Sequence, residues 1–153
     1  MYITYEHEQN LYLMAKACNQ KEKSLLCEAY YLIDEDPDKY GLVDRSEAIL
    51  SASTYYHISK SIIGIEDKII IDCGCHIGLQ QVFFKEAKKY IGIDLSDNFF
   101  KICDNVQFIQ GDIIEVLPTL DLQDSIGISV LCASCFPEVN NIMKQYFNKL
   151  III

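Results

Sequence analysis

The chain has little of what nucleic-acid-binding proteins and membrane proteins are built from. Its 153 residues include one arginine, Arg45, and no cluster of lysines, and the net charge is -9. Because phosphate binding relies on grouped basic side chains, a DNA or RNA partner is disfavoured. No apolar run approaches the roughly 20 residues of a membrane span. Since 50% of the residues are hydrophobic, a disordered chain is excluded. We therefore expect one folded domain that acts on a small molecule or a protein and binds no membrane.

The N-terminus lacks the features of a signal peptide. Residues 1–8 contain no basic patch followed by an apolar core. We therefore expect a cytoplasmic protein in which the seven cysteines remain thiols.

Some of these thiols are candidates for metal binding. Cys73, Cys75 and His76 follow one predicted strand, and Cys132 and Cys135 follow another, so neighbouring strands would bring zinc-ligand chemistry together. Cysteine also serves as a small apolar residue at packed strand ends. We favour that second interpretation and expect no metal.

The most informative pattern is a buried strand that runs into a glycine-bearing turn. Residues 69–73 are apolar on both faces, which is typical of a parallel sheet covered by helices, and Gly74 follows directly. A second buried strand, 90–94, ends in Asp94. Nucleotide-like ligands bind at the carboxyl ends of such strands, and a carboxylate there can accept hydrogen bonds from both ribose hydroxyls. The pattern predicts a ligand that contains adenosine.

The spacing of the glycines distinguishes between such ligands. The sequence lacks both the phosphate-cradling loop G-x-x-x-x-G-K-[ST] and the dinucleotide pattern G-x-G-x-x-G. Asp72, Gly74, His76 and Gly78 instead fit the D-x-G-x-G-x-G template of class I S-adenosylmethionine-dependent methyltransferases, with histidine in place of the middle glycine. The chain resembles that family from about Lys68 to its C-terminus.

The resemblance implies S-adenosylmethionine as cofactor and a role for each matching residue. Asp72, Gly74 and His76 would hold the methionine portion, Asp94 the ribose, and Asp112 the amino group of adenine. The full set that the resemblance assigns to the cofactor is Asp72, Gly74, Cys75, His76, Gly78, Asp94, Leu95, Asp112 and Ile113.

Two departures from the family bear on activity. His76 brings a side chain to the turn, where it either faces the ligand or points to solvent. The fourth strand is followed by residues 133–137, which lack the Asp/Asn-Pro-Pro-aromatic tetrad of amino-group methyltransferases. The catalytic residues therefore remain unknown, with His57 (or a neighbouring tyrosine) and Ser134 as candidates. Since the cofactor carries the reactive group, the lack of an obvious base says little against activity.

The order of elements predicts a doubly wound α/β fold. Helices are expected over 7–33, with a break near Asn19, and over 44–62. Strands and helices then alternate, and the expected sheet is mainly parallel, with about five strands in the order 3-2-1-4-5. The expected elements are strand 68–73, helix 78–88, strand 90–94, strand 106–110, a turn or helix at 113–120, strand 126–132, helix 138–148 and a last strand from 149.

The organisation suggests a helical lid on a cofactor-binding core. Residues 1–64 would form the lid and residues 65–153 the Rossmann-like core, within one structural domain. The family's sheet has seven strands, so a chain that stops at the fifth is either a minimal version or a shortened relative. Its last strand, 150–153, would be an apolar edge that invites pairing with a second copy.

Two functions remain open. The first is an S-adenosylmethionine-dependent methyltransferase acting on a small molecule or a protein. The second is a non-catalytic module that binds the cofactor or a protein partner through the same scaffold.

Overall fold

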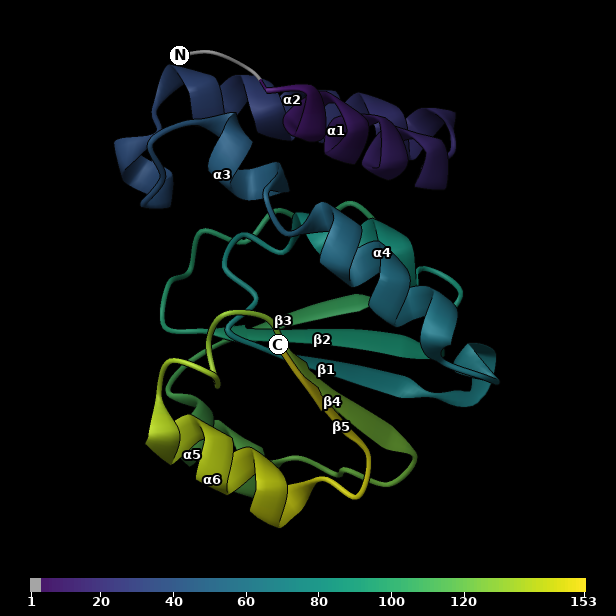
Figure 1. The fold of residues 1–153 in the computed structure, drawn as a ribbon, viewed down its shortest axis with the longest axis vertical. Helices are drawn as coiled ribbons and strands as arrows, with labels where there is room; N and C mark the ends of the chain where they lie inside the picture. Colours follow the sequence, from purple (N-terminus) through teal and green to yellow (C-terminus); the bar gives the residue numbers. More distant parts are fainter. Residues whose placement is uncertain (1–3) are drawn as a thin grey trace.

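The computed structural model describes residues 4–153 and shows one parallel sheet of five strands. The strand order is β3-β2-β1-β4-β5, as the sequence predicts (Figure 1). Residues 1–3 lie outside the described part of the chain. They belong to residues 1–8, for which the sequence predicts no signal peptide. The strands are β1 (Ile69–Cys73), β2 (Lys89–Asp94), β3 (Val106–Gln110), β4 (Ser125–Ser129) and β5 (Leu150–Ile152).

Helices cover both faces of the sheet, which confirms the doubly wound α/β fold. On one face α4 and the 3-10 helix η3 lie against the strands, and α1 and α2 form an outer layer over them (Figure 1). On the other face lie α5 and α6. No helix of residues 4–153 is long and apolar enough to cross a membrane. The α-helices are α1 (Tyr5–Ala17), α2 (Gln20–Glu35), α3 (Arg45–Ile49), α4 (Ala52–Ser61), α5 (Ile113–Val116) and α6 (Pro137–Tyr146). The 3-10 helices are η1 (Asp38–Tyr40), η2 (Ile65–Asp67), η3 (Leu79–Phe84) and η4 (Leu117–Thr119).

The central strand β1 shows why the sheet forms. Successive side chains of a strand point to opposite faces. Ile70 accordingly packs with the cluster beneath α4, and Ile71 with the cluster beneath α5 and α6. Both side chains are fully buried. Burial of an isoleucine on each face contributes about 1.5–3 kcal/mol per side chain, so β1 is held from both sides.

The break between the first two helices lies where the sequence predicts it. Asn19 caps α2 by accepting from the backbone N–H of Glu22 at 2.9 Å, and the Glu22 carboxylate accepts from the Asn19 N–H at 2.7 Å. This reciprocal capping box satisfies two N–H groups that have no partner inside the helix.

The expected single helix 44–62 is wrong, because the chain forms two helices, α3 and α4. Asp44 caps α3 by accepting from the Ser46 N–H at 2.7 Å. At Leu50 and Ser51 the chain turns, and the Leu50 carbonyl accepts from the Asn10 side chain of α1. The turn brings α4 against the sheet while α3 stays with α1 and α2.

The expected helix 78–88 is shorter in the structure, and it is not an α-helix, because residues 79–84 form the 3-10 helix η3. All six of its side chains are buried, between the sheet and the helices of the lid. An amphipathic α-helix keeps one face in solvent, and this segment has no such face. Residues 95–105, between β2 and β3, contain no helix.

The lid and the sheet share one hydrophobic core. A single cluster of buried residues includes Met14 of α1 and Ile33 of α2 together with Ile70 and Tyr90 of the sheet. The N-terminal helices therefore pack on the Rossmann-like core as part of one structure.

Candidate functional site

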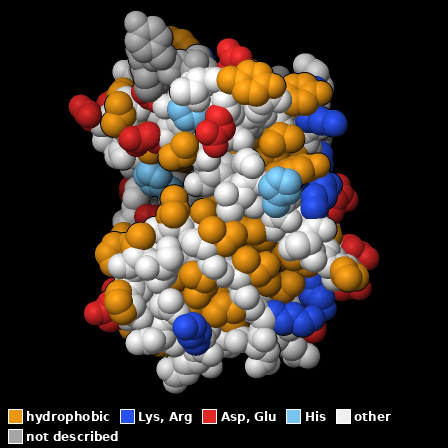
Figure 2. Space-filling model, in the orientation of Figure 1, with side chains coloured by type: hydrophobic (Ala, Val, Ile, Leu, Met, Phe, Trp, Pro, Cys, Tyr) orange, Lys and Arg blue, Asp and Glu red, His pale blue; other side chains and the backbone are white. Residues whose placement is uncertain are grey.

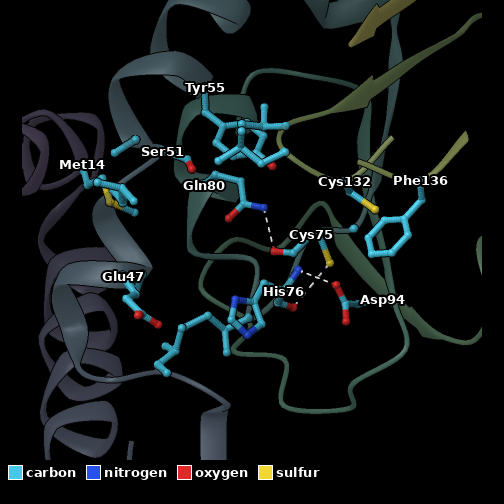
Figure 3. Close-up of a pocket in the computed structure, with 18 residues that line it drawn as sticks. Met14, Glu47, Ser51, Tyr55, Cys75, His76, Gln80, Asp94, Cys132 and Phe136 are labelled. Carbon is cyan, nitrogen blue, oxygen red and sulfur yellow. Dashed lines mark hydrogen bonds between the residues drawn. The ribbon is translucent and has the colours of Figure 1, made fainter. Parts of the chain in front are cut away.

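Two adjoining cavities open at the carboxyl ends of the strands. The larger, about 410 Å³, lies between the strand ends and the N-terminal helices (Figure 3). The second, about 400 Å³, lies between the ends of β2 and β3 and the start of α6. Each is large enough for part of a cofactor. The cavities share the lining residues Gly74, Asp94, Cys132 and Phe136.

The turn after β1 uses its backbone N–H groups within the protein. Those of Gly74 and Cys75 both donate to the Ile93 carbonyl, at 2.8 and 3.1 Å. That of His76 donates to Asp94 Oδ2 at 2.8 Å, and that of Gly78 donates to the Cys75 carbonyl. Phosphate-binding turns point such groups at the ligand instead. The geometry therefore argues against a pyrophosphate at this turn.

Packing accounts for both glycines of the turn. A Cβ on Gly74 would lie 2.5 Å from Cys132 Cβ, and a Cβ on Gly78 would lie 2.4 Å from the Phe108 ring. Both residues also have positive φ, which favours glycine. Gly74 lines both cavities, but Phe108 fills the space beside Gly78, which lines neither.

His76 connects the lid to the turn. Its ring lines the larger cavity, and Nε2 lies 3.1 Å from the Tyr40 carbonyl. A carbonyl only accepts, so Nε2 carries the proton in this contact. Nearby, the Asn98 side chain donates to the Lys39 carbonyl. These two bonds fix η1 to the loops at the carboxyl edge, so the side chain at 76 serves partly as an anchor for the lid.

Asp94 and Asp112 are placed to meet a ligand with hydroxyl and amino groups. Asp94 lines both cavities, and its Oδ1 and Oδ2 each accept one backbone N–H, from Ser96 and His76. A carboxylate offers about four acceptor sites, so Asp94 keeps capacity while its orientation is fixed. Asp112 lines the second cavity and caps α5 through Oδ1, which accepts from the Ile114 N–H. Within residues 4–153, its other oxygen has no hydrogen bond.

Apolar side chains form most of the second cavity. Leu95 is 72% exposed although it is large and hydrophobic, and Phe136 is 56% exposed. Exposed apolar side chains beside a hollow mark a place for a ligand. The apolar lining consists of Leu95, Ile113, Ile114, Phe136 and Val139.

The charge on the lining has one sign. Of the residues that the structure describes, those that line the cavities include no lysine and no arginine. A cleft lined by one sign of charge concentrates ligands of the other sign, so the cleft favours a cationic ligand. The acidic lining residues are Glu47, Asp94, Asp112 and Glu138.

Asp72 lies beneath the larger cavity, and it lines neither cavity, contrary to the contact expected with the methionine portion. Its carboxylate is fully buried and accepts from the Tyr90 and Tyr55 hydroxyls, at 2.5 and 3.2 Å, and from Gln80 Nε2 at 2.7 Å. Burial raises the pKa of Asp72 to about 6, although these hydrogen bonds oppose the shift. Tyr55 and Gln80 both line the cavity. Asp72 therefore orients two lining side chains.

The two catalytic candidates lie away from the cavities. His57 is exposed on α4, where its ring lies against Tyr56, because α4 turns Tyr55 and Ala52 towards the cavity instead. The Ser134 hydroxyl donates to the Ile153 carbonyl at 3.1 Å, and the residue is exposed. Neither lines a cavity.

The cysteines are all free thiols. Cys73 and Cys75 are buried, which agrees with their interpretation as small packing residues. Between Thr4 and the C-terminus, no group of three or more His, Cys, Asp or Glu side chains is arranged to hold a metal ion.

The sequence did not predict most of the lining residues outside the strand ends, and Gln80, Glu47 and Phe136 illustrate why. Gln80 interrupts an otherwise apolar run, and a polar side chain in a buried segment is a signal that it has a partner. Glu47 lies in the first turn of α3, where its carboxylate accepts from the Val43 N–H at 3.1 Å, and a position at a helix start does not by itself indicate a cavity. No signal in the sequence distinguishes Phe136, because its position depends on how α6 begins.

The fold and the cavities define an α/β protein with a ligand cleft at its strand ends. The sequence matches no known family model, and no curated protein matches it significantly.

Proposed function

We propose that the cleft binds S-adenosylmethionine and that the protein transfers its methyl group to a small molecule or a protein. The observation that carries this proposal is the anionic lining around Asp94, which includes no lysine or arginine. S-adenosylmethionine carries a sulfonium, an ammonium and a carboxylate group, so its net charge is positive and it has no phosphate, whereas dinucleotides carry a pyrophosphate that needs donors. The turn after β1 has its N–H groups already bonded, which supports the same choice.

In this proposal the residues of the cleft have separate tasks. Asp94 accepts from the ribose hydroxyls, and Asp112 accepts from the amino group of adenine through its second oxygen. Leu95, Ile113 and Phe136 pack against the adenine ring. The bound cofactor supplies a methyl group activated by positive charge on sulfur. The helices of the lid exclude water and hold the methyl acceptor.

Calorimetric titration with S-adenosylmethionine and, separately, with S-adenosylhomocysteine tests the proposal. We expect both to bind with Kd values on the order of micromolar. Asp94→Asn removes the charge that faces the ribose and should weaken binding by about tenfold or more. Asp97→Asn is a matched control, because Asp97 is exposed and lines neither cavity. Binding of neither compound, or equal binding by the two variants, would overturn the assignment.

A non-catalytic module that binds the cofactor is the second candidate. It is favoured by the position of His57 and Ser134, which lie outside the cavities, and by Tyr55, the neighbouring tyrosine that lines the larger cavity but donates its hydroxyl to Asp72. A methyltransferase releases S-adenosylhomocysteine when a suitable acceptor is present, whereas a binding module returns the cofactor unchanged. Product release is therefore the measurement that separates the two candidates.

We also propose that β5 pairs with a second copy of the chain. Within the described residues β5 is the edge of the sheet. Lys149 and Ile153 bond β4 through their backbone groups, so those of Leu150 and Ile152 face away from β4. Figure 2 shows hydrophobic side chains gathered over this part of the surface. Light scattering should show a dimer, and Ile152→Pro, which removes an outward N–H, should give a monomer.

A further inference from the structure

The larger cavity extends beyond the residues that it shares with the second one. Met14, Leu42 and Ala48 give its far wall an apolar character, and Glu47 and Ser51 are its polar groups (Figure 3). None of these residues lines the second cavity. A ligand held by Asp94 across the shared residues therefore leaves this wall open to another molecule.

Glu47 and Ser51 lie on the same side of the cavity, across from Cys132 and Phe136 (Figure 3). One Glu47 oxygen accepts from the Val43 N–H, and its other oxygen has no hydrogen bond within residues 4–153. The Ser51 hydroxyl likewise has no hydrogen-bond partner in the described part of the chain. A carboxylate beside an apolar wall can accept N–H bonds from an ammonium group, and the Ser51 hydroxyl is a separate polar group of the same cavity (Figure 3).

We propose that this wall, formed by Met14, Leu42, Glu47, Ala48, Leu50 and Ser51, is a subsite for a small amine that has an apolar body. The ammonium group binds Glu47, and the apolar body packs on Met14, Leu42 and Leu50. At this wall a carboxylate or phosphate group is disfavoured relative to an ammonium group, because Glu47 repels it and no lysine or arginine of the described residues lies beside it. The inference rests on the proposed function, since it names the class of acceptor for the same cleft.

The test uses n-hexylamine and hexanoate, two probes of similar length and opposite charge. Each is titrated calorimetrically into the protein alone and into the protein saturated with S-adenosylhomocysteine. We expect hexylamine to bind at least about tenfold more tightly than hexanoate, and Glu47→Gln to remove the preference. The amide oxygen of glutamine still accepts from the Val43 N–H, so α3 is preserved. Glu66→Gln, at an exposed carboxylate of η2 outside both cavities, is the matched control and should keep the preference.

Three results would overturn the subsite. One is equal binding of the two probes by the wild-type protein, and another is an unchanged preference in Glu47→Gln. The third comes from comparing the binding of S-adenosylhomocysteine with that of 5′-methylthioadenosine, a compound that lacks the amino-acid portion. If Glu47→Gln weakens S-adenosylhomocysteine and leaves 5′-methylthioadenosine unaffected, Glu47 binds the cofactor's own amino group. If S-adenosylhomocysteine does not bind at all, the proposed function fails, and titration of the free protein with hexylamine decides the subsite by itself.

Discussion

The two faces of the sheet are held by different means. The face beneath α5 and α6 is packed from apolar side chains such as Ile71, Ile93 and Met143. The face beneath α4 contains the buried polar groups Asp72 and Gln81 as well. An apolar core tolerates the substitution of one apolar side chain by another of similar shape, whereas a buried hydrogen bond is lost when either partner is replaced by an apolar side chain. The polar face is also the one that leads to the larger cavity.

The largest effect is expected at Gln81 on the polar face. Its Nε2 donates to the carbonyls of Gly78 and Phe100, and its Oε1 accepts from the N–H groups of Ile102 and Cys103. Gln81→Leu removes these four bonds, although the Gly78 carbonyl keeps the Gln81 backbone N–H as a partner, and should lower the free energy of unfolding by about 4 kcal/mol. Urea denaturation measures the loss.

The apolar face supplies the control for this prediction. Met143 is fully buried there, and Met143→Leu keeps the volume, so it should cost less than about 1.5 kcal/mol. If Gln81→Leu and Met143→Leu lowered the free energy of unfolding equally, the polar face would not depend on its hydrogen bonds more than the apolar face depends on its packing.

The next effect is a pH dependence that arises from Asp72. Its pKa is raised from 3.8 to about 6 in the folded protein, so between these values the folded state holds a proton that the unfolded state has released. The contribution of Asp72 to stability is therefore present below pH 3.8 and is lost as the pH rises to about 6, by about 3 kcal/mol. Asp72→Asn should remove this part of the slope when denaturation is followed across the same range. An identical slope in the variant would show that Asp72 titrates normally.

A smaller effect tests the close packing of the apolar face. A Cβ on Gly127 would lie 2.5 Å from the Phe147 ring, so Gly127→Ala should cost about 2 kcal/mol. Gly64→Ala is the comparison, because Gly64 has φ of 68° but no atom within 4 Å of a Cβ. That variant should lose only about 1 kcal/mol, from backbone strain. Thermal unfolding of both variants separates overlap from strain, and the reverse order would contradict the packing described.

The smallest effect is expected in the outer layer. Lys85 Nζ lies 3.3 Å from Glu22 Oε2, and both side chains are partly exposed. Lys85→Met should change the free energy of unfolding by less than about 1 kcal/mol, since water screens such pairs. A loss as large as that of Gln81→Leu would show that α2 is held mainly by charge.

The sequence predicted the sheet because its strands are buried on both faces and end in recognisable turns. It also placed Asp94 and Asp112 at the cavities, since the ends of parallel strands meet at one edge. It predicted a helix over 78–88 but not the 3-10 type of η3, because six residues that are buried on all sides show no period that distinguishes one helix type from another. The hydrogen-bond partners of Asp72 and Gln81 depend on how distant segments pack, and no local pattern in the sequence specifies that packing.

The buried helix η3 has a consequence for how the protein folds. Its six side chains lie between the sheet and the helices of the lid, so residues 65–153 alone would expose much of that surface to water. We therefore do not expect such a fragment to fold as a cooperative unit. The boundary at residue 64 divides the sequence into two parts, but these parts share one hydrophobic core. Unfolding should therefore be a single transition in which lid and sheet are lost together.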